Sequence, residues 1–255
     1  MLAAHHLVKR YYGAAVVDDV TFELRPGQIT GYLGPNGSGK TTTIRMLTAL
    51  IEPTSGSVTF RGTPISDNLV EFRRHLGYVP EEPYLYPFLS GREYLELVGR
   101  LRELPEGLLR DKIPAMLAAL GIGDAAEQSI NSYSKGMRQK VLICAALLHD
   151  PDVVIFDEPE SGLDVSTALV LRHLVQALAS RGKAILYSSH ILESVEKVCD
   201  KVIVLHRGRV AADASVQHLR TVMARGSLEE VFSELVSQED PALVATDLAN
   251  LVASH

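Results

Sequence analysis

The sequence has few cysteines, no surplus of basic residues and no long apolar run. Only Cys144 and Cys199 occur, both beside apolar residues, which favours two reduced, buried thiols. Acidic residues outnumber basic ones, and the net charge of −6 argues against a protein that coats nucleic acid. The longest apolar run covers residues 141–148, whereas a membrane-spanning helix needs about 20 residues. We therefore expect a cytoplasmic chain that has no nucleic-acid partner and reaches a membrane only through another protein.

Hydrophobic periodicity predicts an α/β fold with a helical insertion. Residues 1–33 are β-rich, and apolar residues three and four apart predict mainly helices over residues 89–150. Pro114 should kink or restart the middle helix of that region. Strand and helix patterns alternate after residue 150, which is typical of a parallel sheet covered by helices.

A glycine-rich loop predicts a nucleotide site. The residues GPNGSGKT follow an apolar strand and precede a helix, and they match the phosphate-binding pattern G-x-x-x-x-G-K-[ST]. In this pattern the backbone N–H groups surround the phosphates, Lys40 contacts the β- and γ-phosphates, and the Thr41 hydroxyl can ligate Mg²⁺. The predicted nucleotide-binding residues are Gly34, Pro35, Asn36, Gly37, Ser38, Gly39, Lys40, Thr41 and Thr42.

Two carboxylates and a histidine follow later strands. Asp157 and Glu158 end the apolar run VVIF, at the strand end where α/β sheets place ligands. Asp157 is suited to hold Mg²⁺ through its water shell, and Glu158 to act as a general base toward water. His190 follows the strand AILYSS and could hydrogen-bond a γ-phosphate. A lone histidine at a strand end is more often structural, so both interpretations of His190 stay open.

The order of these motifs resembles the nucleotide-binding subunit of an ABC transporter. The glycine loop, YSKGM, DEP, ESGLD and the strand-end histidine follow one another as in that family. The resemblance is to the branch that serves multidrug, antibiotic or polysaccharide export permeases. It implies a P-loop NTPase (RecA-like) core with an N-terminal antiparallel β-subdomain and an inserted α-helical subdomain. The ATPase domain would cover residues 1–220, with the insertion at about 89–150 and a helical tail at 221–255.

Further site residues are carried over from the family by position. Tyr12, rather than Tyr11, takes the place of the aromatic residue that stacks on adenine. The resemblance makes Glu158 the catalytic carboxylate and His190 the switch histidine. Asp164 lies in the loop that crosses between subunits in the family.

The chain departs from the family pattern at two places. Glu81 stands where the family usually has a glutamine, and we expect it to keep an oxygen near Mg²⁺ and to make the site more Mg²⁺-dependent. The alternative for Glu81 is an exposed acidic loop residue. The second departure is YSKGM in place of LSGGQ, with Ser134, Lys135, Gly136 and Met137 at the family's phosphate-contacting positions.

The resemblance also implies partners. Two such subunits, identical or similar, would close head-to-tail around two ATP molecules, with Mg²⁺, and drive a separate integral membrane permease. The chain would then lie at the cytoplasmic face of the cell membrane. Two alternatives are a soluble ABC-type ATPase in translation or DNA repair, which usually has two cassettes or a coiled-coil insertion, and a non-hydrolysing regulatory module. Ser227 and Glu230 have capping-box spacing and predict a short helix in the tail.

Overall fold

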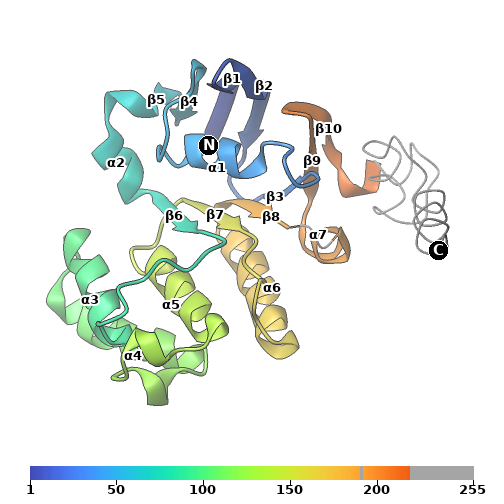
Figure 1. Cartoon of the computed structure of the whole chain (residues 1–255). Helices are drawn as coiled ribbons and strands as arrows, with labels where there is room; N and C mark the ends of the chain where they lie inside the picture. Colours follow the sequence, from blue (N-terminus) through green and yellow to red (C-terminus); the bar gives the residue numbers. More distant parts are fainter. Residues whose placement is uncertain (190–191, 219–255) are drawn as a thin grey trace, which may run out of the picture.

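Two β-sheets form the centre of the molecule (Figure 1). The computed structural model describes residues 1–189 and 192–218. The smaller sheet is antiparallel, with the order β2-β1-β4-β5. Its strands are β1 (Leu2–Tyr11), β2 (Ala14–Leu24), β4 (Ser55–Phe60) and β5 (Thr63–Pro64). It confirms the β-rich N-terminal part.

The larger sheet has six strands in the order β10-β9-β3-β8-β7-β6. These strands are β3 (Ile29–Leu33), β6 (Leu76–Val79), β7 (Val153–Asp157), β8 (Ala184–Ser188), β9 (Lys201–His206) and β10 (Arg209–Ser215). All neighbours pair in parallel except β10, which is antiparallel to β9. The carboxyl ends of β3, β6, β7 and β8 therefore lie at one edge, where an α/β sheet binds its ligand.

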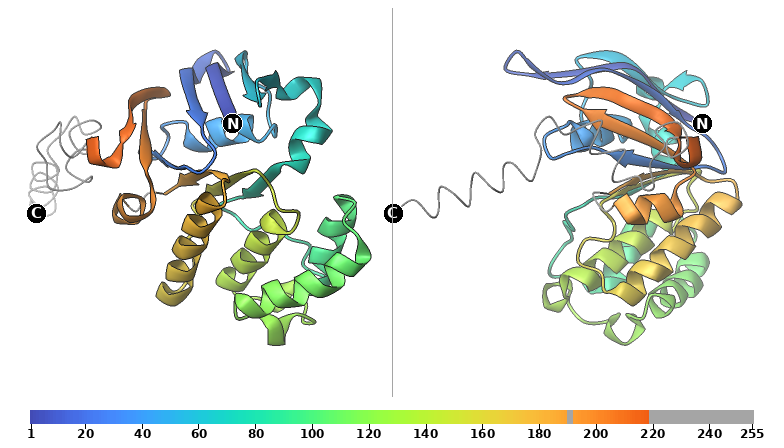
Figure 2. Two further views of the ribbon diagram at one scale, coloured as in Figure 1. Left: turned by 180° about the vertical axis from the view of Figure 1, so that it is seen from behind. Right: turned by 90° about the vertical axis from the view of Figure 1, so that its right-hand side faces the viewer.

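Helices lie on both sides of the larger sheet. They are α1 (Lys40–Leu47), α2 (Leu69–Arg74), α3 (Gly91–Leu101), α4 (Glu106–Ala119), α5 (Lys135–Leu147), α6 (Val165–Ser180) and α7 (Leu192–Val198). Figure 2 shows α5 and α6 on one side, and α1 with the antiparallel sheet on the other. Within the described residues, no helix is long and apolar enough to cross a membrane.

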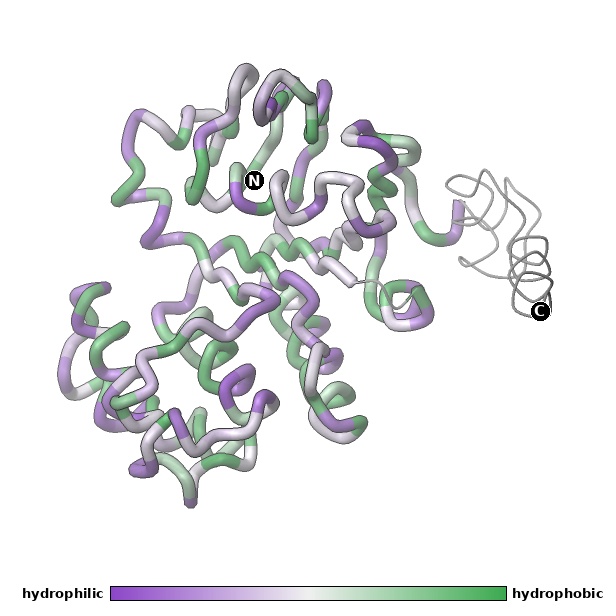
Figure 3. Tube along the Cα trace, in the orientation of Figure 1, coloured by the Kyte–Doolittle hydropathy of each residue, from purple (hydrophilic) through white to green (hydrophobic). Residues whose placement is uncertain are grey.

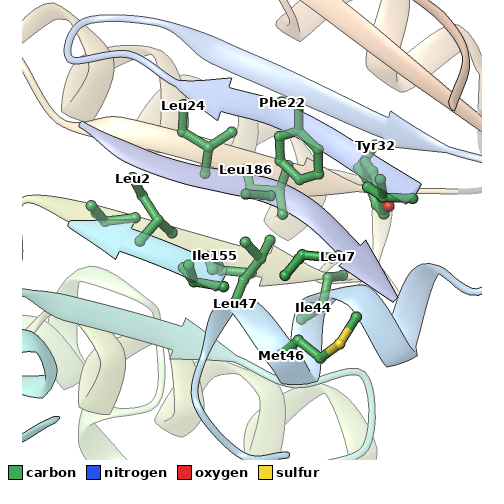
Figure 4. Close-up of a cluster of buried hydrophobic side chains, with 14 of the residues drawn as sticks. Leu2, Leu7, Phe22, Leu24, Tyr32, Ile44, Met46, Leu47, Ile155 and Leu186 are labelled. Carbon is green, nitrogen blue, oxygen red and sulfur yellow. The ribbon is translucent and has the colours of Figure 1, made fainter. Parts of the chain in front are cut away.

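Strand β7 explains how both faces of the larger sheet become buried. Val153 and Ile155 join the cluster formed with α1 and the antiparallel sheet, part of which Figure 4 shows. Val154 and Phe156 join the cluster formed with α5, α6 and α7. Because side chains alternate along a strand, a strand buried on both faces needs an uninterrupted apolar run. Figure 3 shows this hydrophobic character along the central strands.

The helical insertion has a hydrophobic core of its own. Leu95 of α3, Leu109 of α4 and Val141 of α5 are all buried in one cluster. Helix α4 continues through Pro114, so of the two expected effects of this proline the restart of the helix is wrong, and the kink stays a prediction. The missing N–H of Pro114 removes one helix hydrogen bond, and the buried Ile113 and Leu117 beside it hold α4 against its neighbours.

Candidate nucleotide site

The glycine loop joins β3 to α1, as the sequence predicts. Gly37 and Gly39 have φ values of +79° and +104°, a region that residues with a Cβ rarely adopt. A Cβ on Gly39 would also lie 2.7 Å from the carbonyl oxygen of Val16 on β2. Both conformation and space therefore require glycine at Gly39, where α1 begins.

Lys40 lies at the first turn of α1, and its ammonium group is held against the loop. The Nζ atom donates to the carbonyl oxygen of Gly34 at 2.6 Å and to that of Pro35 at 3.2 Å. Burial lowers the pKa of Lys40, and the carboxylates of Glu158, Asp157 and Glu81 act in the opposite direction. The N–H groups at the start of α1 add favourable partial charge for an anion at this place.

One pocket of about 410 Å³ brings the loop and the acidic residues together. It is lined by Val16, Asn36, Gly37, Gly39, Lys40, Thr41, Thr42, Glu81, Asp157 and Glu158. Six predicted loop residues therefore share one pocket with the three predicted carboxylates, at the carboxyl edge of the sheet. Val16 is the lining residue that the sequence did not predict, since a valine in a strand carries no signal of this role.

Asp157 is the most buried of the three carboxylates, with 2% of its surface exposed. It ends β7 and pairs in register with Ser188 of β8. The pKa of Asp157 is raised to about 6, first by burial and then by the negative charges of Glu81 and Glu158, while a hydrogen bond with Ser188 acts in the opposite direction. A nearby cation would stabilise the ionised form of such a buried carboxylate.

Glu158 has a constrained backbone. Its φ of +47° lies in the left-handed region, which is uncommon for residues other than glycine. Its N–H donates to the carbonyl oxygen of Ser188 at 3.1 Å, and its own carbonyl accepts from the N–H of Ser161 at 3.0 Å. These two hydrogen bonds hold the chain where it leaves the sheet, and backbone strain of this kind is often found at functional sites.

The oxygen donors of the pocket fit Mg²⁺ only together with a nucleotide. Thr41, Glu81 and Asp157 offer a hydroxyl and two carboxylates, the hard oxygen ligands that Mg²⁺ prefers. Within residues 1–189 and 192–218, no cluster of three or more His, Cys, Asp or Glu could hold a metal ion by itself. Mg²⁺ commonly binds through one or two carboxylates together with phosphate oxygens and water.

Several predicted residues do not line this pocket. Gly34 and Pro35 contribute the carbonyls that bind Lys40, and Ser38 is buried beneath the loop, where a Cβ on Gly34 would meet its hydroxyl. Tyr12 is fully exposed in the turn between β1 and β2, with a φ of +49°. His190 lies outside the described residues.

A second group of predicted residues gathers at the start of α5. Ser134 caps this helix, since its hydroxyl accepts from the N–H of Met137 at 3.2 Å. The Nζ of Lys135 donates to the Ser161 hydroxyl at 3.0 Å. A Cβ on Gly136 would lie 2.9 Å from the carbonyl oxygen of Gly162. The start of α5 therefore packs against the 158–164 loop and does not line the pocket of its own chain.

Asp164 closes the 158–164 loop and starts α6. Its carboxylate accepts from the Thr167 N–H at 2.9 Å and from the Thr167 hydroxyl at 2.7 Å. These hydrogen bonds lower the pKa of Asp164, the hydroxyl of Thr167 having the largest effect. Asp164 is therefore a helix cap within this chain, away from the residues that line the pocket.

The ABC transporter family model matches residues 17–161, more than half of the chain. The chain is 36% identical to the ABC transporter ATP-binding protein NatA of Bacillus subtilis, over 88% of this chain and 86% of that protein. It is 34% identical to Nod factor export ATP-binding protein I of Ralstonia nicotianae, over 92% and 73%. An uncharacterized ABC transporter ATP-binding protein of a Nostoc species is 40% identical, and the match spans 76% of this chain and 58% of that relative.

Solved structures agree with this relationship. The ATP-binding subunit of an ABC transporter superposes with a TM-score of 0.87 at 34% identity, covering 92% of this chain and 99% of that one. A dimeric ATP-binding cassette with bound ADP and phosphate has the same fold, with a TM-score of 0.78 at 23% identity, covering 85% and 99%. The P-loop NTPase fold, the pocket and the sequence relationship lead to one conclusion: the chain belongs to the ABC transporter family and is an ATP-binding, ATP-hydrolysing subunit.

Proposed function

We propose that two copies of this chain, or one copy and a similar subunit, close head-to-tail around two ATP molecules and drive a separate membrane permease in the direction of export. The observation that carries this proposal is the division of the predicted site. The glycine loop and the carboxylates share one pocket, whereas Ser134 and its neighbours lie at the start of α5, outside that pocket. A second subunit would bring its own α5 to the pocket.

Within this arrangement each chain supplies two sets of groups. In the pocket, Lys40 and the loop N–H groups bind the phosphates, while Thr41, Asp157 and Glu81 hold Mg²⁺, which neutralises phosphate charge. Glu158 accepts a proton from the attacking water, and His190 hydrogen-bonds the γ-phosphate. Tyr12 stacks on the adenine. From the other chain, Ser134, Lys135, Gly136 and Met137 contact the γ-phosphate at the helix N-terminus, beside Asp164.

The permease part of the proposal is supported by an exposed aromatic segment between β6 and α3. Tyr84, Tyr86 and Phe88 have 86%, 61% and 92% of their surface exposed. Large exposed aromatic side chains close together in sequence favour a protein partner. Docking there would place the chain at the cytoplasmic face of the membrane. Purification of the tagged chain from detergent-solubilised membranes should retain a membrane protein with several spanning segments.

The dimer is tested with the Glu158→Gln variant. Removing the general base should stop hydrolysis and leave ATP binding intact, so that ATP with Mg²⁺ converts the variant to a stable dimer in size-exclusion chromatography with light scattering. Adding Ser134→Ala should weaken this dimer, because the hydroxyl that starts α5 is lost. Adding Ser132→Ala is the matched control, since within the described part of the chain the Ser132 hydroxyl donates to the nearby Ser129 carbonyl and to no other group. A Glu158→Gln protein that stays monomeric with saturating ATP, alone and with its permease, would contradict the proposal.

A further inference from the structure

Glu160 forms a buried ion-pair network that the nucleotide pocket does not include. Only 7% of its side chain is exposed. Arg172 donates from Nε to Oε1 and from Nη2 to Oε2, both at 2.8 Å. The hydroxyl of Tyr187 donates to Oε1 at 2.5 Å, and that of Ser194 to Oε2 at 3.2 Å. Both carboxylate oxygens therefore have two partners each.

The four residues of this network come from four segments around the carboxyl edge of the sheet. Glu160 lies in the 158–164 loop, Arg172 on α6, Tyr187 on β8 and Ser194 on α7. Arg172 Nη2 also donates to the Ser194 hydroxyl at 2.8 Å, which closes the network. Burial alone would raise the pKa of Glu160, but the hydrogen bonds from Arg172 and Tyr187 outweigh it and lower this pKa. Glu160 is therefore an ionised side chain that fixes its loop to three other elements.

Two residues of the network lie close in sequence to Glu158 and Ser188, whose backbones are joined by a hydrogen bond. Glu160 follows Glu158 by two residues, and Tyr187 directly precedes Ser188, whose carbonyl accepts the Glu158 N–H. The hydrogen bond between Tyr187 and Glu160 thus connects the same two chain segments as the backbone hydrogen bond between Glu158 and Ser188. Glu158 itself has the uncommon φ of +47°, a conformation that its surroundings must maintain.

The same loop also contacts the start of α5. The Ser161 hydroxyl accepts a hydrogen bond from the ammonium group of Lys135, and a Cβ on Gly162 would lie 2.9 Å from the Lys135 Cδ atom. The 158–164 loop, which Glu160 fixes, therefore begins with Glu158 and contacts the YSKGM segment through Ser161 and Gly162. Stability alone is a weak reason for such a network, because buried ion pairs can often be replaced by apolar residues without loss of stability.

We propose that Glu160 is a positioning residue for ATP hydrolysis, which holds the 158–164 loop so that the Glu158 carboxylate faces the attacking water. This inference rests on the proposed role of Glu158. Loss of the network should lower kcat, because a small displacement of a catalytic group can cost a hundredfold in rate. ATP affinity should change little, since none of the four network residues is among those that line the nucleotide pocket.

The test compares ATP hydrolysis by wild-type protein, Glu160→Gln, Arg172→Met and the double variant. Each single change should lower kcat by about tenfold and change KM by less than about twofold, the pattern of a group that matters only in the transition state. Because the residues act as a unit, the double variant should lose no more than the more affected single variant. Glu193→Gln is the matched control: Glu193 is a largely exposed residue of α7 paired with Lys197, and its replacement should leave kcat unchanged.

Thermal unfolding of the same proteins separates positioning from folding. A lowered Tm with an unchanged kcat per folded protein would make Glu160 merely structural and overturn the inference. If Glu160→Gln does not fold, Tyr187→Phe decides, since it removes one hydroxyl: a kcat several-fold lower supports the inference, and an unchanged kcat overturns it. Glu158→Gln tests the proposed function separately. Full activity in that variant refutes the role of Glu158, whereas an inactive Glu158→Gln with a fully active Glu160→Gln refutes only the positioning role.

Discussion

Glu81 adds a third carboxylate to a pocket that already contains Asp157 and Glu158. Each added negative charge repels the nucleotide phosphates unless a cation neutralises it, and two unit charges 4 Å apart interact by about 1 kcal/mol even in water. The raised pKa of Asp157, due first to burial and then to its acidic neighbours, is a sign of this crowding. Glu81 should therefore make ATP binding and hydrolysis depend more strongly on Mg²⁺.

The Glu81→Gln variant should bind ATP several-fold more tightly without Mg²⁺, and its hydrolysis should depend less on the Mg²⁺ concentration. Both quantities can be measured by titrating Mg²⁺ at constant ATP. Glu82→Gln is the control, because Glu82 is exposed and does not line the pocket. Identical Mg²⁺ curves for wild-type protein and Glu81→Gln would contradict this role of Glu81.

The sequence predicted the residues that belong to a contiguous motif, and it did not predict those brought together by contacts between distant segments. Lys40 and Thr41 lie in a contiguous motif whose backbone shape is set locally by glycines, so the sequence was sufficient. Val16 lines the pocket because β2 packs against Gly39. Glu160 lies outside the pocket, and its network forms because α6, β8 and α7 converge on it. Contacts between distant segments leave no local pattern, and these two residues became visible only in the structure.

Glycines also decide how the helices of the insertion pack. A Cβ on Gly99 of α3 would lie 2.4 Å from the Cδ2 atom of Leu109, whose side chain is buried and has little room to move. A Cβ on Gly107 of α4 would meet nothing within 4 Å. The same substitution at these two positions should therefore have opposite effects on stability.

Gly99→Ala should lower the free energy of unfolding by about 1–3 kcal/mol, the usual cost of an overpacked core. Gly107→Ala should raise it by about 0.5–1 kcal/mol, because alanine loses less backbone entropy in a helix. Urea denaturation followed by circular dichroism measures both. Equal effects of the two substitutions would show that α3 and α4 do not approach closely at Gly99.

The elements that could be predicted from sequence are those with a long or uninterrupted apolar pattern. Strand β7 and helix α6 are of this kind, and the structure contains both. Helix α2 has six residues and one buried side chain, and β10 is a partly exposed edge strand, so neither had a pattern that predicted it. At Pro114, tertiary packing in α4 outweighed the local signal of a helix break.

His149 links the pH dependence of folding to the contact between the helical insertion and the larger sheet. Its ring Nε2 lies 3.0 Å from the carbonyl oxygen of Leu76 on β6. Burial and the nearby charge of Arg102 lower the pKa of His149 to about 4. Between pH 6.5 and 4 the unfolded chain therefore binds a proton that the folded chain does not, and stability falls as the solution becomes more acidic.

The His149→Gln variant keeps an N–H donor but does not titrate. The stability of wild-type protein relative to this variant should decline from pH 6.5 to pH 4, by at most about 1.4 kcal/mol per pH unit for one proton. Urea denaturation at several pH values measures this difference and cancels the effect of other titrating groups. A difference that is constant over this range would mean that the pKa of His149 is the same in the folded and the unfolded chain.

The separate core of the helical insertion has a consequence for local unfolding. Leu95, Leu109 and Val141 pack in a cluster of their own, distinct from the two clusters that flank the larger sheet. Hydrogen exchange follows such cooperative units. The backbone amides of α3 and α4 should thus exchange with solvent deuterium as one group, at a rate different from that of β3, β7 and β8. Motion of the insertion against the sheet would then leave its internal contacts intact.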